Sequence, residues 1–123
     1  MKLLLVEDNA SNRQLAQAVL KRKGHVAEEA RTAPEAIAAL DRGPLPDVVL
    51  LDIDVPGGGL TVVAHIRATP ALARLTVIAF TALAMRGDRE RFLAAGCDGY
   101  ISKPIEVRTF VDEIESIRAQ RSG

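Results

Sequence analysis

The feature that most restricts how this chain can fold is an apolar run, Val48-Val49-Leu50-Leu51, that ends in the carboxylate of Asp52. A run of aliphatic residues without polar alternation is typical of a strand buried on both faces, as in a parallel sheet covered by helices. We therefore predict a strand over residues 47–51, with Asp52 as the first polar group at its carboxyl end. In open α/β sheets, ligands bind in the crevice outside these strand ends.

Length and composition exclude several classes of protein. A chain of 123 residues is long enough for one domain with a sizeable core, and we predict a single domain over residues 1–123. Its 16 basic and 16 acidic residues balance, which disfavours direct binding to nucleic acid. No apolar stretch approaches the roughly 18 residues of a membrane span. The single cysteine, Cys97, cannot form an internal disulfide, so we expect a cytoplasmic protein without membrane association.

Strand and helix patterns alternate along the whole sequence. The predicted strands cover residues 2–6, 25–28, 47–51, 75–80 and 99–102. Five such alternations indicate an α/β fold in which a parallel sheet, joined by right-handed crossovers, carries helices on both faces.

The predicted helices have recognisable ends and inward faces. Asn9 or Ser11 can cap the first helix, Thr32 opens a capping box with Glu35, and Pro70 ends the third helix. The fourth and fifth helices are predicted over residues 88–95 and from about 106 to 118. Apolar residues at helical spacing predict the inward positions, which are Leu15, Val19, Leu20, Ile37, Leu40, Val62, Val63, Ile66, Phe92, Ala95, Val107, Phe110, Val111, Ile114 and Ile117.

Polar side chains follow four of the five predicted strands: Glu7 and Asp8, Asp52, Thr81, and Lys103. Neighbouring parallel strands lie about 5 Å apart, so these groups are expected to converge on one crevice. Crowded carboxylates raise one another's pKa unless a cation sits among them. Hard oxygen ligands with room for water suit Mg²⁺.

A carboxylate, a divalent ion, an ammonium and a hydroxyl are the components of an aspartyl-phosphate site. The carboxylate attacks phosphorus, while the metal, Lys103 and Thr81 neutralise the phosphoryl oxygens. Because Asp52 follows the most central predicted strand, we expect it to be the nucleophile.

Four motifs resemble those of two-component response-regulator receiver domains, in the same order and over essentially the whole chain. They are Val6-Glu7-Asp8-Asn9, Leu51-Asp52, Phe80-Thr81-Ala82 and Tyr100-Ile101-Ser102-Lys103-Pro104. The resemblance implies a three-layer α/β/α sandwich with the flavodoxin-like strand order 2-1-3-4-5. It also implies a signalling regulator, which would catalyse only its own phosphorylation and dephosphorylation.

The same resemblance implies a metal site and a phosphate donor. Glu7, Asp8 and Asp52 would bind Mg²⁺, or Mn²⁺, together with the backbone carbonyl of Asp54. Asp52 would accept a phosphoryl group from a histidine kinase or a histidine phosphotransferase.

Other residues would couple phosphorylation of Asp52 to the binding of a partner protein. Thr81, Ala82 and Lys103 are expected beside it, Thr81 and Tyr100 resemble the family's switch pair, and the bond before Pro104 is expected to be cis. Phosphorylation would then alter the surface of the fourth helix, fifth strand and fifth helix, which is expected to bind a downstream protein.

The loop after Asp52 departs from the family pattern. Relatives usually have one more residue between Pro56 and Leu60, with a bulky apolar and a polar side chain in place of the glycines 57–59. We expect this run to be under little steric constraint. Asp54 adds a carboxylate that is expected to face the phosphate and to tune its hydrolysis.

Several functions fit these residues. Segments 81–88 and 96–100 resemble stand-alone cell-division regulators of the DivK type, and also receivers attached to hybrid histidine kinases. The triplet Asp52-Ile53-Asp54 matches the start of the haloacid-dehalogenase phosphatase signature, although that family places it near the N-terminus. A pseudo-receiver that binds partners regardless of phosphate is a further alternative.

Overall fold

Strands and helices alternate through the computed structural model, which describes residues 1–82 and 87–122. The elements are β1 (Lys2–Val6), α1 (Ala10–Arg22), β2 (Val26–Ala30), α2 (Ala33–Arg42), β3 (Val48–Leu51), α3 (Gly59–Ala68), β4 (Thr76–Thr81), α4 (Asp88–Ala95), β5 (Gly99–Ser102) and α5 (Phe110–Ser122). Residues 83–86, which belong to the segment compared above with the DivK type, lie outside the described residues.

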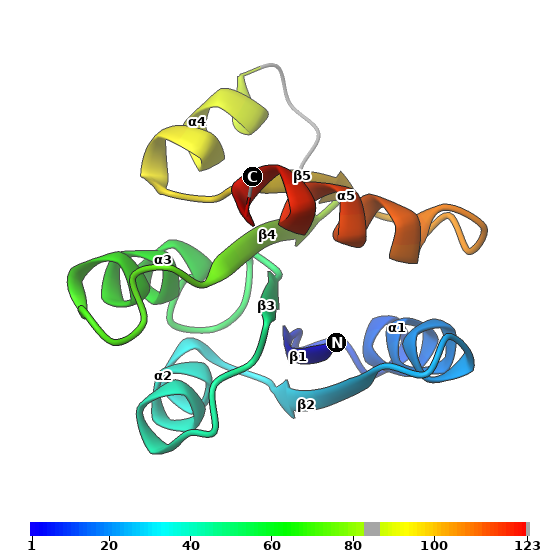
Figure 1. Ribbon diagram of the computed structural model, residues 1–123, viewed down its shortest axis with the longest axis horizontal. Coiled ribbons are helices and arrows are strands. Elements are labelled where there is room, and N and C mark those ends of the chain that lie inside the picture. Colours follow the sequence, from blue (N-terminus) through cyan, green and yellow to red (C-terminus); the bar gives the residue numbers. More distant parts are fainter. Residues whose placement is uncertain (83–86, 123) are drawn as a thin grey trace.

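The strands form one parallel sheet in the order β2-β1-β3-β4-β5, which confirms the predicted fold class and strand order (Figure 1). In this order β1 and β3 are neighbours near the centre, and Val6 pairs with Leu51. The residues that follow them, Glu7 and Asp52, therefore leave the sheet at the same level.

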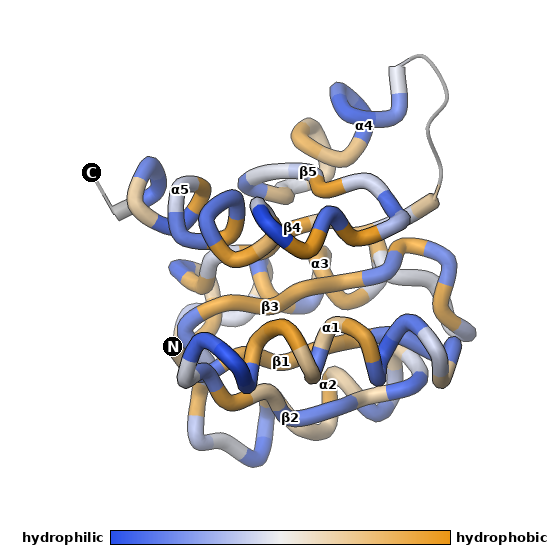
Figure 2. Tube along the Cα trace, turned by 90° about the vertical axis from the view of Figure 1, so that its right-hand side faces the viewer, coloured by the Kyte–Doolittle hydropathy of each residue, from blue (hydrophilic) through white to orange (hydrophobic). Residues whose placement is uncertain are grey.

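Two apolar cores lie on opposite faces of the sheet. Helices α2, α3 and α4 cover the face that carries Leu4, Val49 and Val77, whereas α1 and α5 cover the face that carries Leu5 and Leu50. Figure 1 shows α2 and α3 on one side of the strands and α1 on the other. In Figure 2, β3 is a continuous hydrophobic tube, as expected for a strand with helices on both faces.

Side chains cap the first two helices as predicted. Asn9 precedes α1 and its Oδ1 accepts the backbone N–H of Asn12 at 2.9 Å. Thr32 precedes α2 and its Oγ1 accepts the N–H of Glu35 at 3.2 Å. These caps fix where the chain leaves the first two strands. Among the described residues, the helices are too short or too polar to cross a membrane.

Some predicted boundaries were wrong by one to four residues. The strands predicted at 25–28, 47–51 and 75–80 lie at Val26–Ala30, Val48–Leu51 and Thr76–Thr81, so Thr81 is the last residue of its strand. Helix α5 begins at Phe110 instead of residue 106, and the N–H groups of Thr109 and Phe110 both donate to the carbonyl of Glu106 in a preceding turn.

Three predicted inward positions were also wrong. Leu15 and Val107 are 41% and 44% exposed, and Ala95 is exposed as well. Leu15 lies between inward-facing residues of α1, where the buried stripe instead contains Arg13 and Ala16. Val107 lies in the turn before α5 and so is not on the buried face of that helix.

Candidate functional site

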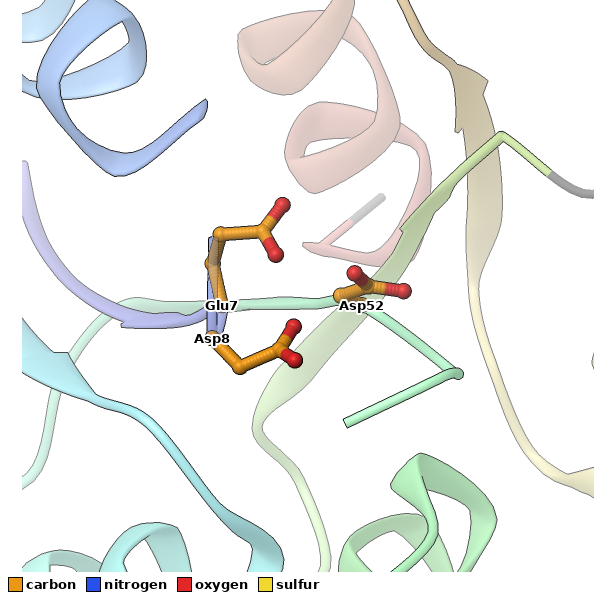
Figure 3. Close-up of side chains that lie close together, drawn as sticks. All are labelled: Glu7, Asp8 and Asp52. Atoms are coloured by element: carbon orange, nitrogen blue, oxygen red, sulfur yellow. The ribbon is translucent and has the colours of Figure 1, made fainter. Parts of the chain in front are cut away.

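Three carboxylates meet at the carboxyl ends of β1 and β3. Glu7, Asp8 and Asp52 each offer an oxygen that lies within 4.8 Å of the other two. Figure 3 shows Glu7 and Asp8 leaving adjacent positions of the chain while Asp52 lies beside them. Backbone hydrogen bonds fix their positions, since the N–H of Asp52 donates to Val6 at 2.9 Å and that of Glu7 donates to Ala30 at 2.9 Å.

Lys103 completes this cluster from the end of β5. Its Nζ donates to Asp52 Oδ2 at 2.8 Å and also contacts Glu7 Oε1. The Glu7 side chain is fully buried and Asp52 is only 4% exposed, whereas Asp8 is exposed. Solvent therefore reaches the cluster on the side of Asp8, where a ligand can approach.

Burial and the neighbouring charges act in opposite directions on the pKa values of Glu7 and Lys103. Burial is the largest influence on the pKa of Glu7 and raises it. Hydrogen bonds from Lys103 and from the N–H of Asn9 lower this pKa, and the nearby Asp52 raises it. The net effect is a pKa above its ordinary value. Burial alone would lower the pKa of Lys103, but its hydrogen bonds to Asp52 and Glu7 outweigh this and raise it. Lys103 therefore stays charged and is a cation among these carboxylates.

Backbone donors orient the two buried carboxylates. The N–H of Asp54 donates to Asp52 Oδ1 at 2.9 Å, and the N–H of Asn9 donates to Glu7 Oε2 at 3.2 Å. The side chain of Asp54 is exposed. The backbone carbonyl of Asp54 as a metal ligand remains a prediction.

The glycine run after Asp52 is sterically constrained, contrary to the sequence-based expectation. A Cβ on Gly59 would lie 2.6 Å from the Cα of Ile53 and 2.8 Å from the carbonyl oxygen of Asp52, which leaves no room for a side chain. Gly57 has φ +91° and packs against α2, where the N–H of Ala33 donates to Pro56 at 2.9 Å. These glycines hold the loop tightly against the phosphoacceptor candidate and the start of α2.

Most of the remaining predicted residues lie at the same end of the sheet, and Tyr100 lies further back along β5. Thr81 is buried at the end of β4 and its carbonyl accepts the N–H of Lys103 at 3.0 Å. Ala82 is exposed, and the Lys103–Pro104 bond is cis. Tyr100 pairs with Ala79 further back in the sheet.

The ring of Tyr100 packs on α4. It stacks on Phe92 with ring centroids 5.8 Å apart and an interplanar angle of 21°. Burial and the nearby Asp88 raise the pKa of Tyr100. The Tyr100 ring thus packs β5 against α4.

Sequence reasoning missed two residues that support the cluster. Arg13 of α1 is buried and donates to the backbone carbonyls of Glu7 at 3.1 Å and Asp8 at 2.9 Å. Phe80 lies under Lys103, whose Nζ is 5.1 Å from the ring centroid. Arg13 stands on the inward stripe of its helix with Ala16 and Leu20, and a cation at such a position is a signal that buried acceptors lie nearby.

The chemistry of these groups fits a hard divalent cation. Glu7, Asp8 and Asp52 supply carboxylate oxygens close enough for one ion, and Lys103 alone contacts two of these acids within the described residues. One ammonium does not balance three carboxylates, so the cluster retains excess negative charge. The donors are all oxygens and one acid faces solvent, which suits Mg²⁺ or Mn²⁺.

Comparison with known proteins connects this geometry to a family. The sequence model described as "response regulator receiver domain" matches residues 3–115. The polar-differentiation response regulator DivK of Brucella ovis is 39% identical over 115 residues, which cover 93% of each chain.

Solved structures with the same architecture include metal-bound proteins. The receiver domain of a sensor histidine kinase from Pseudomonas aeruginosa PAO1, with a magnesium ion coordinated in its active site cleft, is 29% identical and matches with a TM-score of 0.83, covering 99% of this chain and 98% of that one. The Mn²⁺-bound form of the response regulator Rcp1 is 27% identical with a TM-score of 0.79, covering 96% and 91%.

Proposed function

This chain belongs to the response regulator receiver domain family of two-component signalling, and we propose that Asp52 is its phosphoacceptor. The observation that carries the proposal is the buried Asp52 carboxylate, which lies between Lys103 and two further acids at the carboxyl edge of the sheet. An Asp52 oxygen forms a bond to phosphorus while the bond from phosphorus to a donor histidine nitrogen breaks. The electron pair of the broken bond leaves with that nitrogen.

The residues around Asp52 have distinct roles in this transfer. Lys103 orients the carboxylate through its 2.8 Å hydrogen bond and offers positive charge to the phosphoryl oxygens. The N–H of Asp54 holds the second carboxylate oxygen. Glu7, Asp8 and Asp52 would hold Mg²⁺, or Mn²⁺, with the backbone carbonyl of Asp54, and Thr81 and Ala82 would stand beside the phosphate. When bound, the ion supplies further positive charge for the phosphoryl oxygens.

Phosphorylation by a small donor tests this proposal. The protein is incubated with acetyl phosphate and Mg²⁺, and intact mass spectrometry measures the addition of one phosphoryl group. Wild type and Asp54→Asn should be labelled, because the Asp54 side chain is exposed and only its N–H contacts Asp52. Asp52→Asn should not be labelled. Equal labelling of Asp52→Asn and wild type, or no labelling of either, would overturn the assignment.

We further propose that the phosphate comes from a histidine kinase or histidine phosphotransferase. The phosphorylated chain then passes the signal on by binding a downstream protein. The face formed by α4, β5 and α5 is the proposed output surface, with Thr81 and Tyr100 as the switch pair. The stack of Tyr100 on Phe92 supports this route, since it joins β5 to α4. A regulatory role of the DivK type is favoured over a hybrid-kinase origin by the 39% identity to DivK across most of both chains.

The phosphatase alternative predicts a different result. The match to the receiver family over residues 3–115 argues against it. A receiver domain releases at most the phosphate that it carries, whereas a haloacid-dehalogenase-type enzyme turns over phosphate esters continuously. Phosphate release from p-nitrophenyl phosphate, followed over many equivalents of protein, separates the two; sustained turnover would favour the phosphatase. A pseudo-receiver would show no labelling in the first experiment.

A further inference from the structure

Arg13 contacts the site through the backbone instead of through a carboxylate oxygen of the cluster. A single atom, Arg13 Nη1, donates to the carbonyl oxygens of both Glu7 and Asp8, at 3.1 and 2.9 Å. Its Nε lies 3.7 Å from Oε1 of Glu29 on β2, and the residue is 8% exposed. The guanidinium therefore lies against the backbone of the acidic pair and also pairs with an acid of β2.

These two carbonyls need such a donor because the chain has just left the sheet. The last sheet-type bonds on either side of β1 use the carbonyl of Val6 and the N–H of Glu7. Beyond them, the carbonyls of Glu7 and Asp8 bond to the Arg13 side chain. The bond from Arg13 to Glu7 is buried and the one to Asp8 is partly buried. A buried carbonyl without a donor is costly, so removal of the guanidinium favours a different backbone path at residues 7 and 8.

The backbone path at residues 7 and 8 decides where their carboxylates point. With both carbonyls turned towards Arg13, the carboxylates of Glu7 and Asp8 lie beside Asp52 (Figure 3). The next N–H, that of Asn9, is then directed at Glu7 Oε2. One guanidinium thus contacts the backbone of two of the three proposed metal ligands.

We propose that Arg13 is a positioning residue for the metal site: it preorganises Glu7 and Asp8 and thereby sets the affinity for Mg²⁺. This inference rests on the proposed function. Groups that orient metal ligands typically change metal affinity by 10-fold to 100-fold when they are removed. Arg13 does this through the main chain, so that it touches neither the ion nor the phosphate.

The test compares Mg²⁺ binding by wild type, Arg13→Met, Arg13→Lys and Arg22→Met, measured by isothermal titration calorimetry. Arg22→Met is the matched control, because it makes the same change in the same helix at an exposed position. We expect Arg13→Met to bind Mg²⁺ about 10-fold more weakly than wild type. Arg13→Lys keeps a positive donor and should fall between the two, whereas Arg22→Met should match wild type.

A second readout separates positioning from a general loss of stability. Urea unfolding is measured for each variant with and without Mg²⁺, because at a fixed Mg²⁺ concentration a tighter-binding folded state gains more stability, by an amount that depends on the logarithm of the concentration over the dissociation constant. Arg13→Met should gain less from Mg²⁺ than wild type does. Equal gains and equal dissociation constants for wild type and both Arg13 variants would overturn the inference and leave the proposed function intact. A folded wild type that ignores Mg²⁺ would instead overturn the proposed metal site and this inference with it.

Discussion

Asp52 and Asp98 are both largely buried aspartates in ion-pair clusters, but they lie at opposite ends of the sheet and differ in how completely their charge is balanced. Asp52 follows β3 at the carboxyl edge, where Lys103 is shared between it and Glu7. Asp98 precedes β5 at the amino edge, where Arg67 and Arg121 both pair with it at 2.9 and 2.7 Å.

The Asp98 cluster is satisfied by protein groups. Asp98 Oδ2 also accepts the N–H of Val77 at 2.8 Å. Arg67 uses its remaining donor capacity on the carbonyls of Ala73, Leu75 and Gly96, at distances from 2.7 to 3.0 Å. This network joins the loops around β4 and β5 to the end of α5. Its charged groups already have protein partners, so few of them are available to bind a ligand.

The Asp52 cluster is arranged in the opposite way. Glu7, Asp8 and Asp52 crowd together, and the pKa of Glu7 is raised chiefly by burial and further by Asp52. Excess charge of one sign is unfavourable for folding and favourable for binding a cation and then a phosphoryl group. Asp98, whose charge is fully compensated by two arginines, joins elements of the structure, whereas the proposed phosphoacceptor Asp52 shares its single lysine with another acid.

The largest effect in this comparison is expected from Asp98. Asp98→Asn leaves two arginines facing each other without their shared carboxylate, and we expect the free energy of unfolding to fall by about 3 kcal/mol. Urea denaturation measures the change, with Asp41→Asn as the control, since Asp41 is exposed and pairs only with His65 in the described residues. Labelling by acetyl phosphate should persist in folded Asp98→Asn. Unchanged stability would show that the Asp98 cluster is not structural.

A smaller effect of opposite sign is expected from Asp52. Asp52→Asn removes a negative charge next to Glu7, while Lys103 keeps its contact with Glu7. We therefore expect the free energy of unfolding in the absence of Mg²⁺ to rise by on the order of 1 kcal/mol. The same denaturation experiment measures it. A loss of stability comparable with that of Asp98→Asn would remove the distinction drawn between the two clusters.

The smallest effect concerns Cys97, which adjoins the Asp98 cluster. Burial, opposed by Arg67 and assisted by Asp98, raises the pKa of this thiol from 9.0 to about 11. Only the thiolate reacts, so alkylation by iodoacetamide at pH 8 should be about 100-fold slower in the folded protein than in urea. The folded rate should rise with pH until about 11. Equal rates in the folded and unfolded protein would mean that the thiol is exposed.

Much of the site could be predicted from the sequence because the ends of the buried strands can be recognised in it. The unbroken apolar runs before Glu7, Asp52 and Thr81 identify buried strands, and a parallel sheet brings their carboxyl ends to one edge. The acidic pair, Asp52 and Lys103 were therefore expected to converge. The structure places Lys103 within ion-pairing distance of Glu7 and Asp52, and Asp8 beside these two acids.

The spacing of apolar residues failed as a guide where the outcome depended on how a nearby loop folds back on its neighbours. Leu15 and Arg13 are two residues apart in α1, yet the leucine is exposed and the arginine is buried, because the loop after β1 presents carbonyls to that side of the helix. Gly59 was predicted to provide freedom, but its backbone passes too close to Ile53 for any side chain.

The sequence by itself determined the order of strands and helices, the parallel sheet and the polar residues at its carboxyl edge, because these follow from the spacing of apolar residues and from chain connectivity. Only the tertiary structure decided which charges are balanced. Asp52 and Asp98 both lie beside strands, but the folded chain brings two arginines to Asp98 and gives Asp52 a lysine that it must share. Charge balance is a property of side chains brought together from distant elements, and no local pattern encodes it.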